Sequence, residues 1–122
     1  MNHQILLVDD EEHMLRLLQF ALKPVSASIH CVRRGSEALD FLKTNRPKLV
    51  LLDYAMPDMD GVETLRQIRD QAGGDEVQVI MLTARDQTAI RKEAAGLRVQ
   101  AFLTKPFSPS ALVRRATELL KG

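Results

Sequence analysis

Short apolar runs alternate along this chain with segments in which apolar residues return every three or four positions. Four runs rich in Leu, Val and Ile lie near residues 5–8, 48–52, 78–82 and 101–103. Runs of this length between amphipathic segments predict strands that alternate with helices. A weaker run near residues 28–32 includes His30 and is typical of a strand at the edge of a sheet.

The residues between these runs indicate where helices begin and end. The first helix should stop at Lys23-Pro24, because a residue before proline avoids the helical conformation. Ser36 is a suitable N-cap for the second helix. Ser108 followed by Pro109 predicts the start of the last helix, since serine caps well and proline is favoured at the first helical position.

Strands that alternate with helices imply a parallel sheet covered on both faces, because each parallel crossover is right-handed and needs a helix to return the chain. The predicted fold class is therefore α/β: a flavodoxin-like, doubly wound, five-stranded parallel sheet of order 2-1-3-4-5, with five helices. This order gives the weak second strand an edge position. It also places a ligand site where the first and third strands diverge, at their carboxyl ends.

The size and charge of the chain narrow the possible functions. We expect one domain, residues 1–122, without an output domain in this chain. Seventeen basic and sixteen acidic residues give a formal charge of +1, so no overall field favours nucleic acid or a membrane surface. The single cysteine, Cys31, and the absence of signal-peptide features favour a cytoplasmic location. No apolar run approaches the ~18 residues of a membrane span.

Charged and hydroxyl side chains stand where the apolar runs end. These residues are Asp9, Asp10, Asp53, Thr83 and Lys105. Because the carboxyl ends of neighbouring parallel strands meet at one edge of the sheet, we expect these side chains in one crevice. Three carboxylates close together either hold protons or bind a cation. Oxygen ligands with room left for water favour Mg²⁺ over Ca²⁺.

Each of these residues alone has an ordinary structural explanation as a helix cap, a turn residue or a solvated side chain. Their alignment at neighbouring strand ends favours a phosphoryl site instead. Asp53 can be the nucleophile, since carboxylates form aspartyl phosphates when a metal and a cation offset the phosphoryl charge. Lys105 can supply that cation, and Thr83 and the backbone N–H of Ala84 can donate hydrogen bonds from an adjacent strand.

Four motifs contain these residues: Val8-Asp9-Asp10-Glu11-Glu12, Leu52-Asp53-Tyr54-Ala55-Met56-Pro57-Asp58-Met59-Asp60-Gly61, Leu82-Thr83-Ala84 and Leu103-Thr104-Lys105-Pro106-Phe107. In order and spacing they resemble the receiver domain of two-component response regulators, similar to chemotaxis regulators. The resemblance covers nearly the whole chain. Such domains take a phosphoryl group from a sensor histidine kinase or a histidine phosphotransfer protein onto an aspartate, which the resemblance identifies with Asp53.

The resemblance also implies a metal site. Asp10, Asp53 and the backbone carbonyl of Ala55 would bind Mg²⁺ directly, while Asp9 would assist through water.

The same resemblance assigns the phosphoryl and switch residues. Thr83, the Ala84 N–H and Lys105 would hold the phosphoryl oxygens, and a cis bond would join Lys105 to Pro106. Thr83 and Phe102 would form the switch pair, in which the aromatic ring turns inward when the threonine moves onto the phosphoryl group. Many relatives have tyrosine where this chain has Phe102, so a hydroxyl is lost. A plain core aromatic is the alternative interpretation of Phe102.

The function implied is a phosphoacceptor signalling switch, not an enzyme with a separate substrate, although it would promote its own phosphorylation and dephosphorylation. Its output face would be the fourth helix, fifth strand and fifth helix. That face would control a downstream protein or a missing output domain, and it leaves room for a phosphorylation-dependent homodimer. We expect no direct nucleic acid binding by this domain and no membrane association. Basic residues on this side, which are often only a solvated face, are Arg85, Arg91, Lys92, Arg98, Arg114 and Arg115.

The alternatives to this function are a phosphohydrolase and a pseudo-receiver. An aspartate-nucleophile phosphohydrolase places a second acid two residues after its nucleophile, where this chain has Ala55. A pseudo-receiver would bind proteins without phosphorylation. The complete set of carboxylates, hydroxyl and ammonium at the strand ends argues against a pseudo-receiver.

Overall fold

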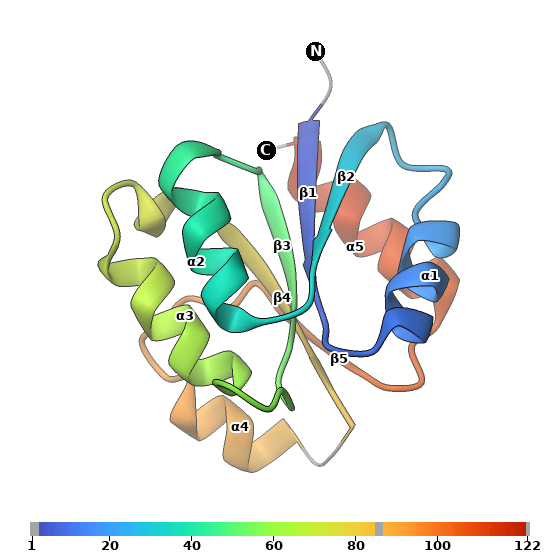
Figure 1. Ribbon diagram of the computed structural model, residues 1–122. Coiled ribbons are helices and arrows are strands. Elements are labelled where there is room, and N and C mark those ends of the chain that lie inside the picture. Colours follow the sequence, from blue (N-terminus) through green and yellow to red (C-terminus); the bar gives the residue numbers. More distant parts are fainter. Residues whose placement is uncertain (1–2, 85–86, 122) are drawn as a thin grey trace.

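The computed structural model describes residues 3–84 and 87–121 (Figure 1). Five parallel strands form one sheet in the order β2-β1-β3-β4-β5. The strands are β1 (His3–Val8), β2 (Ala27–Val32), β3 (Leu49–Asp53), β4 (Gln78–Thr83) and β5 (Ala101–Thr104). The predicted fold class and strand order are confirmed, including the edge position of the weak second strand.

Helices cover both faces of the sheet. They are α1 (Glu12–Ala21), α2 (Gly35–Thr44), α3 (Gly61–Asp70), α4 (Gln87–Glu93) and α5 (Pro109–Lys121). In Figure 1, α2 and α3 lie on one side of the sheet, and α1 and α5 lie on the other. A short 3-10 helix, η1 (Gly74–Glu76), follows α3 and was not predicted.

The central strands are apolar on both faces because helices bury both. In β1, Leu6 and Val8 pack with the core under α2, α3 and α4, whereas Ile5 and Leu7 pack with the core under α1 and α5. Each of these four side chains is at most 1% exposed. The two cores pack β1, β3 and β4 from both faces, and this packing brings the carboxyl ends of the three strands together at one edge of the sheet.

The start of α2 corrects one prediction. Ser36 is not its N-cap, because the helix begins at Gly35 and Arg34 occupies the cap position. The Arg34 side chain makes no capping hydrogen bond to the helix. The carboxylate of Asp58, in the loop between β3 and α3, instead accepts hydrogen bonds from the amides of Gly35 (3.4 Å) and Ser36 (3.3 Å). A group from a distant segment thus satisfies the free amides, which local sequence could not reveal.

Two other helix ends lie close to their predicted positions. The first helix ends at Ala21 with Leu22 as C-cap, just before Lys23. At the start of α5, the Ser108 hydroxyl accepts a hydrogen bond from the Ala111 amide at 3.3 Å, as expected for an N-cap serine. Within the described residues, no helix combines the length and the apolar character that crossing a membrane requires.

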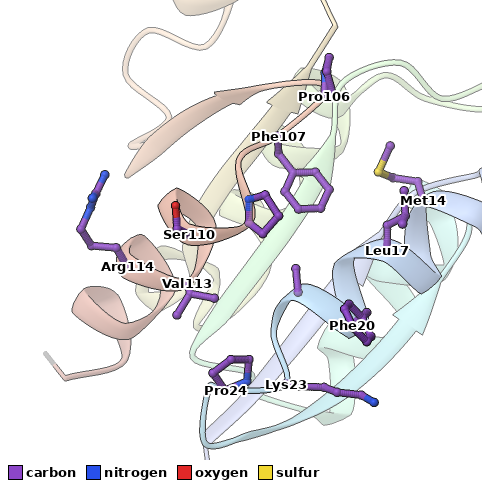
Figure 2. A pocket seen from close by; sticks show the side chains of 12 residues that line it. Met14, Leu17, Phe20, Lys23, Pro24, Pro106, Phe107, Ser110, Val113 and Arg114 are labelled. Atoms are coloured by element: carbon purple, nitrogen blue, oxygen red, sulfur yellow. The ribbon is translucent and has the colours of Figure 1, made fainter.

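An apolar groove of about 860 Å³ lies between α1 and α5 (Figure 2). We call it the α1–α5 groove. Met14, Leu17 and Phe20 of α1 line it together with Phe107 and Val113 from the last part of the chain. Phe20 is 70% exposed and Leu17 is 42% exposed, so large apolar side chains reach solvent here.

Candidate functional site

Three carboxylates meet at the carboxyl ends of β1 and β3. Asp53 is the last residue of β3, and Asp9 and Asp10 directly follow the neighbouring strand β1. Asp9 is fully buried, Asp53 is 3% exposed, and Asp10 is half-buried. One oxygen from each carboxylate lies within 4.8 Å of the others. Together with Lys105, these residues form what we call the acidic crevice.

Lys105 provides the positive charge of the acidic crevice. Its Nζ lies 2.9 Å from Asp9 Oδ2 and 3.0 Å from Asp53 Oδ1. Its backbone N–H donates to the carbonyl of Thr83 at 2.7 Å, which ties the end of β5 to the end of β4. The Lys105–Pro106 peptide bond is cis. The ammonium therefore bridges two carboxylates that come from different strands.

The charges in the acidic crevice shift two pKa values. Burial raises the pKa of Asp53 to about 6, with the neighbouring Asp9 charge adding to the rise and Lys105 opposing it. For Lys105, burial lowers the pKa, but the hydrogen bonds and charges of Asp9 and Asp53 outweigh burial, so the pKa is raised. The acidic crevice contains three carboxylates and one ammonium, and this excess of negative charge suits a hard cation with oxygen ligands.

The remaining predicted residues surround the acidic crevice. Thr83 ends β4, next to β3, and is 1% exposed. Ala55 and Ala84 are exposed in the loops that follow β3 and β4. Phe102, on β5, is partly buried and packs against the core on the α4 side. The guanidinium of Arg91, on α4, lies 4.4 Å from the centre of the Phe102 ring.

The structure divides the basic residues predicted for the output face. Arg85 lies outside the described residues. Arg98 pairs with Asp75, and Arg115 lies 3.8 Å from Glu118. Arg114 lines the α1–α5 groove, on the side of the sheet away from α4. The described members are exposed, and Arg114 is the one that lies in the α1–α5 groove.

Polar contacts that hold α4 could not be identified from sequence. The hydroxyl of Tyr54, the residue after Asp53, donates to Glu93 Oε2 at 3.1 Å. Arg66 of α3 donates to the backbone carbonyl of Glu93 at 3.1 Å. Arg69 of α3 donates to the carbonyl of Leu97 at 2.9 Å, in the segment after α4. These bonds join segments distant in sequence, and no spacing rule predicts them.

Comparisons with known proteins agree on one family. The model of the response regulator receiver domain matches residues 5–117. The chain is 36% identical over 121 residues to the alkaline phosphatase synthesis transcriptional regulatory protein PhoP of Bacillus subtilis. It is 35% identical over 121 residues to the transcriptional regulatory protein SrrA of Staphylococcus aureus. These matches cover 99% of this chain but 50% and 49% of the relatives, so the chain spans about half their length.

A solved structure shows the same architecture. The receiver domain of the Francisella response regulator 1452 superimposes with a TM-score of 0.87 at 29% sequence identity, over 98% of each chain.

Proposed function

The chain belongs to the response regulator receiver domain family, and from that premise we propose a function for its acidic crevice. Asp53 accepts a phosphoryl group from a sensor histidine kinase or a histidine phosphotransfer protein, with Mg²⁺ bound beside it. The observation that carries this proposal is the buried Asp53 carboxylate held 3.0 Å from Lys105 and next to two further carboxylates. We also propose a cytoplasmic location, in keeping with the single cysteine, Cys31.

The acidic crevice has the donor chemistry that a magnesium ion needs. We assign Asp10, Asp53 and the Ala55 carbonyl as direct ligands and Asp9 as a ligand through water. All four supply oxygen, which hard divalent cations prefer. A cation held there would offset the negative charge of the phosphoryl group. Lys105 supplies the second positive charge, and its contacts with Asp9 and Asp53 keep it in place before any phosphoryl group arrives.

The transfer forms one bond and breaks one. An ionised Asp53 oxygen attacks the phosphorus of a phosphohistidine, the phosphorus–nitrogen bond breaks, and the imidazole nitrogen leaves with the electron pair. Attack requires the ionised carboxylate. With a pKa of about 6, Asp53 is mostly ionised near neutral pH. Lys105, the Thr83 hydroxyl and the Ala84 N–H hold the phosphoryl oxygens.

The output depends on Thr83 and Phe102. Met81 pairs with Phe102 across β4 and β5, and side chains alternate along a strand, so Thr83 points to the same face as Met81 and Phe102. When Thr83 moves toward the phosphoryl group, Phe102 fills the space. Arg91 lies over the Phe102 ring and passes the change to α4. The α4-β5-α5 face then controls a partner protein or an output domain.

Sequence position 55 distinguishes this switch from a phosphohydrolase. That enzyme class needs an acid–base side chain two residues after its nucleophile, and Ala55 offers none. The chain is therefore proposed to promote only its own phosphorylation and dephosphorylation.

Mass spectrometry after treatment with acetyl phosphate and Mg²⁺ tests the proposal. We expect one added phosphoryl group, about 80 mass units, on Asp53. Asp53→Asn or EDTA should prevent the addition, because both the carboxylate and the metal are needed. Asp40→Asn is the matched control, since Asp40 is exposed on α2, pairs there with Lys43 and lies outside the acidic crevice.

Two results would contradict the proposal. Undiminished labelling of Asp53→Asn would show that the nucleophile is misassigned. Steady hydrolysis of p-nitrophenyl phosphate above ~1 s⁻¹ would favour the phosphohydrolase.

A further inference from the structure

Arg33 contacts the acidic crevice from the segment that follows β2. Its Nη2 and Nε donate to the backbone carbonyl of Asp10 at 2.9 Å and 3.3 Å. The two residues are 23 positions apart in sequence. Nothing in the phosphoacceptor chemistry of Asp53 assigns a part to this arginine, and a contact across the edge of the sheet has no sequence pattern.

The peptide unit between Asp10 and Glu11 is held at both ends. Its carbonyl accepts from Arg33, and its N–H donates to Asp9 Oδ1 at 2.9 Å. The other oxygen of the Asp9 carboxylate accepts from Lys105 Nζ at 2.9 Å. A continuous series of hydrogen bonds therefore runs from Arg33 to Lys105, and bonds in series polarise one another.

We propose that Arg33 is a positioning residue for the acidic crevice. By holding the Asp10–Glu11 peptide, it restricts the backbone torsions on both sides of that peptide and so limits where the Asp10 carboxylate can lie. It also orients the N–H that holds Asp9. Cation binding then needs less rearrangement of the carboxylates. The inference deepens the proposed function and rests on it.

The position of Arg33 is itself fixed. Its backbone N–H donates to Glu37 Oε1 at 2.8 Å, in the first turn of α2. The next residues, Gly35 and Ser36, donate to Asp58 in the loop that follows β3. Residues 33–36 thus connect the loop that carries Asp10 with the loop that follows Asp53.

The charge of Arg33 and its hydrogen bonds to Asp10 should have opposite effects on the affinity for Mg²⁺. A guanidinium near a bound cation repels it, so removal of that charge alone should strengthen Mg²⁺ binding. Loss of positioning should weaken binding.

Arg34 separates the two effects. It lines the same hollow beside Asp10, with a volume of about 410 Å³, and it is exposed like Arg33. Within residues 3–84 and 87–121, its side chain makes no hydrogen bond.

Mg²⁺ titration followed by Tyr54 fluorescence tests the proposal, because Tyr54 is the only tyrosine and adjoins Asp53. Arg33→Gln should raise the dissociation constant roughly tenfold, as loss of a second contact behind a metal ligand commonly does. Arg34→Gln should leave it unchanged or lower it. Arg33→Lys, which keeps the charge and one donor group, should recover part of the loss. The Glu11 amide NMR signal should move in Arg33→Gln and stay in Arg34→Gln.

Equal Mg²⁺ affinities in Arg33→Gln and Arg34→Gln would overturn the positioning role. Tighter binding by Arg33→Gln than by wild type would do the same and would show that charge dominates. Should Arg33→Gln fail to fold in EDTA, the comparison of Arg33→Lys with Arg34→Lys decides instead, with weaker binding expected only for Arg33→Lys. Asp10→Asn tests the metal site itself: unchanged binding there would refute the proposed function and not only the positioning role.

Discussion

Strand ends form the acidic crevice, whereas two helices and the segment before α5 form the neighbouring α1–α5 groove. Lys105 belongs to the first, and the next two residues, Pro106 and Phe107, line the second. In the acidic crevice, charged groups are buried and paired with one another. In the α1–α5 groove, apolar groups such as Phe20 are left in water.

The two regions differ in what they do to stability. Burial of Asp53 beside other carboxylates raises its pKa, which means that its charged form destabilises the fold. Among the described residues, every buried side-chain nitrogen or oxygen has a hydrogen-bond partner. The destabilisation in the acidic crevice therefore comes from its charges and not from unsatisfied hydrogen-bonding groups. Exposed apolar side chains in the groove stabilise the fold little. The proposed functional residues of the acidic crevice therefore lower the stability of the fold, whereas the exposed side chains of the α1–α5 groove change it little.

Among the changes made within the two regions, Asp53→Asn gives the largest expected effect. Without metal, it should stabilise the protein by about 3 kcal/mol at pH 8, because a pKa raised from 3.8 to about 6 corresponds to that penalty for the charged form. The folded protein keeps the Asp53 proton up to about pH 6, whereas the unfolded chain loses it near 3.8. The penalty is therefore absent below that range, grows as the pH rises, and is complete above about pH 6.

Urea denaturation in EDTA between pH 3 and 8 measures this effect. Asp58→Asn is a control of opposite sign. Although burial opposes it, hydrogen bonds from Met59, Ser36 and Gly35 lower the pKa of Asp58, so its stabilising contribution is present at neutral pH and lost in acid. If the free energy of unfolding of Asp53→Asn differed from that of wild type by the same amount at every pH, the stability change would not come from the Asp53 charge.

Magnesium should remove most of this penalty. At a concentration 100 times its dissociation constant, Mg²⁺ should stabilise the wild-type protein by about 2.7 kcal/mol. Asp53→Asn and Asp10→Asn should lose this gain, because each removes a proposed ligand. Thr83→Ala should keep it. Thermal unfolding with Mg²⁺ and with EDTA provides the measurement, and equal gains in all four proteins would refute the assigned ligands.

Beryllium fluoride with Mg²⁺, an acyl-phosphate mimic, should change the two regions unequally. Amide NMR signals should shift in residues 87–99 and 102–105, where Phe102 and α4 respond to Thr83. Leu17 and Phe20 in the α1–α5 groove should shift much less. Thr83→Ala should retain Mg²⁺ binding yet lose most of the distant shifts. If only residues touching Asp53 respond, the switch assignment is wrong.

The acidic crevice could be predicted from the sequence because strand topology brings its residues together. Asp9, Asp53, Thr83 and Lys105 each stand at the end of an apolar run, and parallel strands bring such ends to one edge. The structure places Asp9 and Asp53 within 3.0 Å of the Lys105 ammonium. The roles of the individual residues are still predictions.

Contacts between side chains of distant segments could not be predicted. Asp58, and not Ser36, accepts hydrogen bonds from the first amides of α2, and Arg33 donates to the Asp10 carbonyl. Both contacts form because loops that follow different strands lie close in space. The α1–α5 groove was missed for a similar reason. Its walls belong to helices at opposite ends of the chain, and exposure of Phe20 depends on how those helices pack.

Phe20→Ala gives the smallest expected effect. With 70% of the residue exposed, the free energy of unfolding should change by no more than ~0.5 kcal/mol. The lost contact with the Lys23 ammonium, 5.1 Å from the ring centre, is offset because alanine favours the helix more than phenylalanine does. Leu18→Ala is the matched control: this neighbour on α1 is fully buried, and its truncation should cost roughly 2–5 kcal/mol. Urea denaturation measures both. A cost above ~1 kcal/mol for Phe20→Ala would show that this side chain belongs to the core under α1 and α5, and the contrast between a costly crevice and a neutral groove would then fail.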